Sequence, residues 1–115
     1  MELEKNRIDY INVNDALRRI GGNVDLYKRL LGRFVAGNNV EELENALQRG
    51  DFDASARLAH TLKGVSANLS LVGINSVSVD LEQAIKSGLD YSSQLDKLKK
   101  VYNVTLEIIE EMTKA

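Results

Sequence analysis

A single histidine, His60, is the residue of this chain best suited to covalent chemistry. A free imidazole titrates at about pH 6.5, so near neutral pH its uncharged form is a good nucleophile. Lys63 and Gly64 follow three and four residues later, a spacing that places them beside His60 on one face of a helix. The bare backbone at Gly64 would let a large group reach the imidazole, with a positive charge beside it.

The helix that carries His60 is predicted to run from Asp51 or Asp53 to about residue 69. Four apolar positions fall within roughly 60° of one another on its helical wheel and form the predicted buried stripe, Leu58, Leu62, Val65 and Leu69. His60 lies about 190° from the centre of that stripe and Lys63 about 130°, so both side chains are expected to face solvent. A mid-helix glycine costs about 1 kcal/mol relative to alanine, and we interpret Gly64 as leaving room for a large group beside the imidazole.

Each of these signals also has an ordinary explanation. A lone surface histidine commonly has no function, a lone lysine is commonly a solvated charge, and a mid-helix glycine commonly marks a close contact between helices. Their coincidence on the face opposite the apolar stripe is what favours a functional site.

The amino-acid composition excludes several kinds of functional site. The chain has 115 residues, of which 43% are hydrophobic and 28% charged, which predicts one domain with a real core. It has no cysteine, which excludes disulfides, a thiol nucleophile and cysteine-ligated zinc, and its one histidine excludes multi-histidine metal sites. A formal charge of -2 argues against nucleic-acid binding. The apolar runs are too short to span a membrane, and the N-terminus has no secretory signal. We therefore expect a cytoplasmic location.

The pattern is helical nearly throughout, and no proline interrupts it. Periodicity and capping residues predict helices over residues 15–20 (capped by Asn14), 24–36, 39–50, 53–69, 74–88 and from 90 or 92 to about 112. The short connections favour antiparallel neighbours in a bundle. Residues 1–13 are expected to be a partly ordered lead-in, and residues 14–115 the bundle domain.

The stretch around the histidine, AHTLKGVSANL over residues 59–69, resembles the signature of histidine-containing phosphotransfer (HPt) domains. That signature is a histidine, any two residues, lysine, glycine and then small residues. Residues 16–22, 26–31, Phe34, 50–52 and 81–88 are also similar to segments of these domains, and the resemblance covers roughly Val13 to Met112.

The resemblance implies an all-α fold, an antiparallel four-helix bundle with shorter N-terminal helices. It implies that His60 is the phospho-acceptor and Lys63 its companion, in phosphorelay signalling of a two-component system. The chain departs from the family at Ser70, where many members have glycine. It also departs at the position where the family often places a glutamine near the histidine ring: the best match is Glu82, with Gln83 adjacent. A carboxylate there would accept a hydrogen bond from the ring nitrogen that is not phosphorylated.

The expected partners are receiver domains of response regulators or a hybrid histidine kinase, and we expect a monomer that needs no cofactor. A receiver has to approach until its aspartyl phosphate touches His60. The small side chains of Ala56 and Ala67 permit that approach, and Arg57 and Asn68 lie toward the edge of the same face, where they would supply polar contacts.

No nucleotide-binding motif is present, so we expect a phosphocarrier, not an enzyme that phosphorylates itself from ATP. Two alternatives remain open. One is a helical protein-binding module that does no chemistry and does not need His60. The other is the phospho-accepting fragment of a larger hybrid histidine kinase.

Overall fold

Every regular element in the described part of the chain is helical. The computed structural model describes residues 7–37 and 39–114. A short 3-10 helix, η1 (Arg7–Asp9), is followed by α2 (Val13–Arg19), α3 (Val24–Ala36), α4 (Asn39–Gln48), α5 (Phe52–Asn68), α6 (Val72–Lys86) and α7 (Ser92–Thr113). The all-α fold class predicted from the sequence is confirmed.

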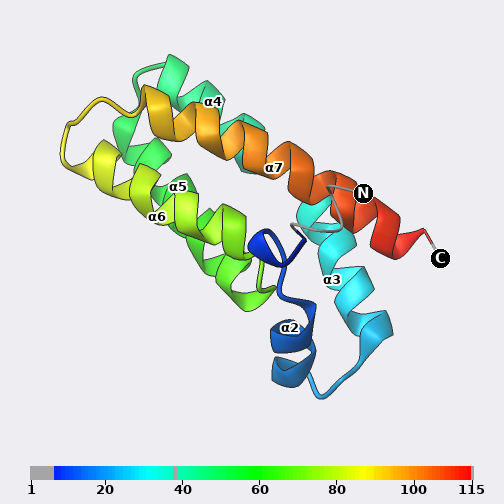
Figure 1. Ribbon diagram of the computed structural model, residues 1–115. Coiled ribbons are helices and arrows are strands. Elements are labelled where there is room, and N and C mark those ends of the chain that lie inside the picture. Colours follow the sequence, from blue (N-terminus) through cyan, green and yellow to red (C-terminus); the bar gives the residue numbers. More distant parts are fainter. Residues whose placement is uncertain (1–6, 38, 115) are drawn as a thin grey trace.

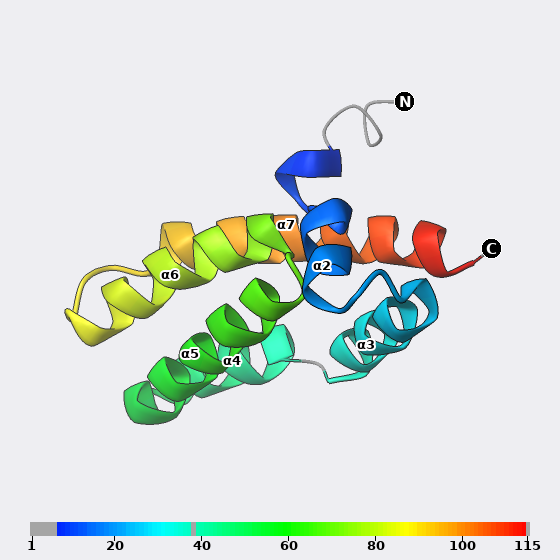
Figure 2. The same ribbon diagram turned by 90° about the horizontal axis from the view of Figure 1, so that it is seen from below.

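Helices α4 to α7 form an antiparallel four-helix bundle (Figure 1). Each packs on the next along the chain, and α7 returns to contact α4, which closes the bundle. α7 is the longest element, with 22 residues, and it extends beyond the bundle. Both views show α3 alongside this extension, and α2 contacts α3 in turn (Figures 1 and 2). The N-terminal helices α2 and α3, with 7 and 13 residues, therefore cover one end of the bundle.

The core runs along the axis of the bundle and continues under α3. Each helix from α3 to α7 contributes at least one large side chain that is at most 2% exposed: Tyr27, Leu31, Leu43, Leu62, Leu81, Leu98 and Ile108. The rings of Phe34 and Tyr102 meet edge to face with centroids 6.0 Å apart, which joins α3 to α7.

The N-terminal segment joins this core. The structure starts α2 at Val13, two residues before the prediction, because Asn12 and not Asn14 caps it: the Asn12 side chain accepts a hydrogen bond from the backbone N–H of Asp15 at 3.1 Å. Ile11 is 2% exposed and the N–H of Asn12 donates to the carbonyl of Ser70. Of the lead-in expected over residues 1–13, residues 1–6 lie outside the described residues, and the domain boundary stays a prediction.

α6 also begins earlier than predicted, at Val72. Gly73, expected in the break before the helix, lies in its first turn. A Cβ on Gly73 would come within 3.0 Å of the Val101 side chain and 3.2 Å of the Asp9 carbonyl, so glycine lets the N-terminal segment approach closely. Among the described residues, no helix has the length and apolar character needed to cross a membrane.

Candidate functional site

The helix that carries His60, α5, is fixed at both ends. At its start, the Asp51 side chain accepts a hydrogen bond from the N–H of Ala54 at 3.1 Å. At its end, the buried hydroxyl of Tyr27 donates to the carbonyl of Leu69 at 2.8 Å. Burial raises the pKa of Tyr27 to about 12, so this hydroxyl keeps its proton. The first contact caps the helix, and the second links its C-terminal end to α3.

Ser70 ends α5 where many HPt domains have glycine. Its φ of 54° lies in the left-handed region that favours glycine. The Ser70 hydroxyl donates to the Asp15 carboxylate at 2.6 Å, and this hydrogen bond lowers the pKa of Asp15. This hydrogen bond to α2 stabilises a backbone conformation that serine seldom adopts, so the helix ends here without a glycine.

The buried side of α5 differs from the predicted stripe. Leu62 and Leu69 are buried as expected, but Leu58 and Val65 are only half-buried. The most buried line is instead Ser55, Ala59, Leu62 and Ser66. Relative to the prediction, this line is rotated by about 60° on the helical wheel, toward Lys63.

Small side chains explain the difference. Ser55 and Ser66 satisfy their own hydroxyls by donating to backbone carbonyls within α5, to Asp51 at 2.8 Å and Lys63 at 3.0 Å. A hydroxyl that is satisfied within its own helix can be buried at little cost. Serine and alanine also let neighbouring helices approach closely, and α5 packs against both α4 and α6. Hydropathy alone assigns serine to the surface, so the prediction missed this line.

The rotation brings Lys63 against α6 instead of leaving its head in solvent as predicted. Its side chain is 33% exposed, and its Nζ lies 2.6 Å from Oε1 of Glu82. The backbone at this point is fixed as well, because the Asn75 side chain on α6 donates to the Lys63 carbonyl at 2.8 Å. Asn75 was not singled out from the sequence.

His60 meets the same carboxylate. Nδ1 of the ring lies 3.1 Å from Oε2 of Glu82, while 67% of the His60 side chain is exposed. Glu82 itself is only 6% exposed on α6. The adjacent Gln83 is exposed, and its amide donates to Ser87 at 3.2 Å. Of the two residues considered as partners of the ring, Glu82 is the one in contact.

A third group contacts Glu82. Nζ of Lys86, one turn later on α6, lies 3.1 Å from Oε2. Lys86 was missed in the sequence, although its i,i+4 spacing from Glu82 is the usual signal for a helical ion pair. The hydrogen bond from Lys63, together with those from Lys86 and His60, lowers the pKa of Glu82 from 4.5 to about 2 against the opposing effect of burial.

An ionised carboxylate has consequences for the imidazole. Because Glu82 is unprotonated near neutral pH, it only accepts hydrogen bonds. We therefore assign the hydrogen of the neutral His60 ring to Nδ1, which leaves the lone pair on Nε2. The ring is thus oriented by a buried partner and carries its nucleophilic nitrogen on a largely exposed side chain.

Gly64 lies beside this ring on open surface. A Cβ built on Gly64 meets no described atom within 4 Å, apart from its chain neighbours and the backbone of its own helix. The alternative explanation, a close helix contact, therefore finds no support at Gly64. The missing side chain leaves open space next to His60.

Two of the four predicted partner-contacting residues lie directly beside the ring. Ala56, which is half-buried, and the exposed Arg57 line a shallow depression that His60, Thr61, Glu82 and Lys86 complete. Ala67 is exposed about two turns further along α5. Arg57 adds a further positive charge to the surroundings of the ring.

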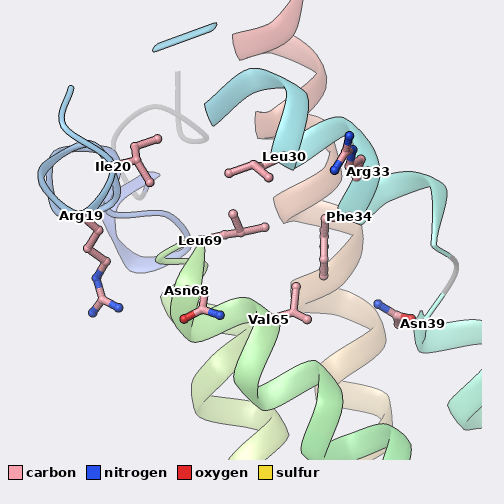
Figure 3. Close-up of a pocket in the computed structure, with 9 residues that line it drawn as sticks. All are labelled: Arg19, Ile20, Leu30, Arg33, Phe34, Asn39, Val65, Asn68 and Leu69. Carbon is pink, nitrogen blue, oxygen red and sulfur yellow. The ribbon is translucent and has the colours of Figure 1, made fainter. Parts of the chain in front are cut away.

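Asn68 lies at a second depression, near the C-terminal end of α5 (Figure 3). Its volume is about 700 Å³. Apolar side chains from α3, α5 and the adjoining turns line it, Ile20, Leu30, Phe34, Val65 and Leu69. Arg19 and Arg33 lie on opposite sides of it in Figure 3, with Asn39 near its edge. The predicted contact residues therefore follow α5 from the ring to this apolar depression.

Comparison with known proteins agrees with the architecture. A family model described as the Hpt domain matches residues 35–113, which include α4 to α7 and the whole charged cluster around Glu82. No curated protein and no solved structure matches the chain. Because the family match covers well over half of the chain, the protein belongs to the Hpt domain family, whose members carry phosphoryl groups in His–Asp phosphorelays with receiver domains.

Proposed function

We propose that this protein is a phosphorelay carrier in which Nε2 of His60 accepts a phosphoryl group from a receiver-domain aspartate and passes it to another receiver. The observation that supports this most directly is the state of the ring: Nδ1 faces a buried carboxylate at 3.1 Å while the side chain is 67% exposed. A nucleophile that is oriented through Nδ1 and whose side chain is largely exposed suits transfer between proteins, because phosphoryl transfer depends mainly on positioning and charge.

Lys63, Lys86 and Gly64 have complementary roles in this proposal. The two ammonium groups lie on the carboxylate that the ring contacts, and they balance the negative charge that a phosphoryl group brings. Gly64 leaves room for the phosphoryl oxygens, because, its chain neighbours aside, a Cβ at this position would meet no described side chain within 4 Å. The metal ion and the acidic pocket belong to the receiver.

We propose that the receiver docks along α5, over Ala56, Arg57, Ala67 and Asn68. Small side chains permit close approach, and the guanidinium of Arg57 complements an acidic partner. A carrier must release each partner, which implies a modest interface of about 1,200 Å² or less. We further propose that the carrier is a monomer, acts in the cytoplasm, and does not phosphorylate itself from ATP.

One labelling experiment tests the function. The protein is incubated with a receiver phosphorylated on its aspartate, and protein-bound phosphate is followed. We expect an acid-labile, base-stable label in the wild type and none in His60→Gln, because the chain has one histidine. Label retained by His60→Gln would overturn the assignment. Label that appears with Mg-ATP alone would instead indicate an autokinase.

A further inference from the structure

We propose that Asn75 is a positioning residue for phosphoryl transfer: its side-chain amide on α6 holds the peptide group between Lys63 and Gly64, and so keeps the backbone beside His60 in place. The proposal rests on the phosphocarrier function. It goes beyond that function because it assigns a role to a residue of α6 that acts through the backbone of α5.

The carbonyl of Lys63 accepts hydrogen bonds from two side chains. Nδ2 of Asn75 lies 2.8 Å from this oxygen, and Oγ of Ser66 lies 3.0 Å from it. Because a carbonyl oxygen only accepts, the Asn75 amide must present its NH2 group here, which fixes the orientation of the amide. Ser66 is fully buried and Asn75 is half-buried. The Ser66 bond stays within α5, whereas the Asn75 bond links α5 to α6.

This carbonyl belongs to the peptide group that joins Lys63 to Gly64. Glycine gives the backbone more conformational freedom than other residues, and within a helix it weakens the local structure relative to alanine. The outer side of this turn is open, because a Cβ on Gly64 would meet no described atom within 4 Å beyond its chain neighbours and the backbone of its own helix. The hydrogen bonds to the Lys63 carbonyl therefore restrain the backbone from the inner side, where the glycine loosens it.

Asn75 and Glu82 contact α5 from one line of α6. They lie seven residues apart, which corresponds to about two turns and a rotation of only about 20° on the helical wheel. Asn75 binds the backbone of Lys63, and Glu82 binds its head, with Nζ 2.6 Å from Oε1. Lys63 is thus held at both ends by the same helix, and a rotation of α5 against α6 would lengthen both hydrogen bonds.

The position of α5 against α6 matters because His60 makes its orienting contact across the same interface. Nδ1 of the ring lies 3.1 Å from Oε2 of Glu82. Hydrophobic packing between helices is non-directional, whereas a hydrogen bond restricts both distance and angle. Displacing a reacting group by about 1 Å can slow a reaction on the order of 100-fold. A directional bond to the backbone one turn from His60 is therefore suited to fixing where the imidazole lies.

Two substitutions of Asn75 remove the hydrogen bond in different ways. Asn75→Leu keeps a side chain of similar bulk without a donor, and Asn75→Ala removes the bulk as well. Single-turnover labelling by a phosphorylated receiver at increasing concentrations gives a plateau rate, which reports the transfer step, and a half-saturating concentration, which reports binding. We expect both variants to lower the plateau rate about tenfold and to leave the half-saturating concentration unchanged, because Asn75 acts on the backbone beside the ring.

Thr105→Val is the matched control. Thr105 is fully buried on α7, and its hydroxyl donates to the Val101 carbonyl at 2.7 Å. The substitution therefore also removes a side-chain hydrogen bond to a helix carbonyl, but in a helix that does not carry the ring. Urea denaturation gives the stability of each variant. We expect Thr105→Val to transfer like wild type even where it loses as much stability as Asn75→Leu.

A double-mutant cycle tests the link to Gly64. Alanine restricts the backbone where glycine leaves it free, so the peptide group in Gly64→Ala needs less support from α6. Asn75→Leu should therefore lower the plateau rate by about threefold or less in the Gly64→Ala background, against about tenfold in the wild type. Comparing the two ratios removes any effect of the alanine methyl group itself on transfer.

The outcomes separate this proposal from the function on which it rests. Wild-type protein that takes no label overturns the phosphocarrier function, and this proposal with it. A wild-type plateau rate in Asn75→Leu leaves the function standing and overturns the role of the Asn75 hydrogen bond. If Asn75→Leu does not fold, Asn75→Ala decides by the same measurements.

Three further results would also contradict the positioning role. An equal loss of rate in Thr105→Val would show that transfer follows overall stability. A higher half-saturating concentration at an unchanged plateau rate would make Asn75 a receiver contact. An equal fall in rate in the wild-type and Gly64→Ala backgrounds would show that Asn75 does not compensate for the glycine.

Discussion

Nζ of Lys63 on α5 and Oε1 of Glu82 on α6 lie 2.6 Å apart, although 19 residues separate them in the chain. This ion pair crosses the interface between the two helices that meet at His60. In the proposed mechanism, this position lets the lysine move between the Glu82 carboxylate and a phosphoryl group on the ring.

We expect Lys63→Ala to slow phosphoryl transfer from a receiver by on the order of tenfold, equivalent to about 1.4 kcal/mol. The reason is the loss of one of the two ammonium groups that contact Glu82 beside the ring. Lys86→Ala should slow transfer as well, and single-turnover labelling measures both. Lys99→Ala, which removes a lysine paired with Glu44, is the control and should transfer like wild type. Wild-type rates in Lys63→Ala would remove Lys63 from the mechanism.

Two substitutions of Gly64 should separate protein stability from phosphoryl transfer. Gly64→Ala should stabilise the protein by up to about 1 kcal/mol, because α5 gains a better helix former and the new methyl group meets open space. Gly64→Gln should block transfer while the fold persists, since its side chain fills the space beside the ring. Denaturant melts and labelling measure the two effects.

Gly32 supplies the comparison for Gly64. It lies within α3 and is exposed, and a Cβ there also meets no described atom within 4 Å outside its own helix. Gly32→Gln should therefore leave transfer unchanged. Unfolding of Gly64→Ala would contradict the access argument and indicate a packing role.

The depressed pKa of Glu82 predicts how stability depends on pH. The pKa of Glu82 is about 2 in the folded protein, against an ordinary 4.5. The ionised form is thus favoured by folding, and its contribution to the free energy of unfolding is complete above about pH 4.5 and lost as pH falls toward 2. Wild type should exceed Glu82→Gln in stability near pH 6 to 7, and the difference should shrink below about pH 4.5.

Urea denaturation at a series of pH values measures this difference. Glu44→Gln removes a more exposed carboxylate and should change stability by at most about 1 kcal/mol. A gap between wild type and Glu82→Gln that stays constant from neutral pH to about pH 2 would show that packing, and not charge, stabilises this position.

The docking face can be tested at Ala67. Because Ala67 is exposed on α5, Ala67→Arg should leave the circular dichroism spectrum and the melting temperature near wild type. The same substitution should weaken receiver binding about tenfold or more, which corresponds to about 1.4 kcal/mol of binding free energy. Ser93→Arg, at an exposed small residue on α7, should bind normally. NMR titration with a receiver should shift signals between Ala56 and Asn68. Shifts confined to α7 would overturn the docking face.

Features that depend on neighbours along one helix could be predicted from the sequence. His60, Lys63 and Gly64 share a face of α5 because three- and four-residue spacings are fixed by helix geometry. The helical fold class followed equally from local periodicity, from the absence of proline and from short connections. Helix starts were less secure: Asn12 and Asn14 are both good capping residues, and tertiary contacts of Ile11 and Asn12 selected the earlier one.

Packing between helices set which side chain meets the ring and which way α5 faces. Glu82 and Gln83 are adjacent, and a helix turns about 100° per residue, so the rotation of α6 against α5 chooses one of them. That rotation depends on the packing of buried Ser55, Ala59 and Ser66, whose small size hydropathy does not register. The same packing turned Lys63 inward, to the carboxylate that Lys86 contacts from one turn away on α6. Contacts between helices arise from shape and distance across the bundle, which local spacing does not encode.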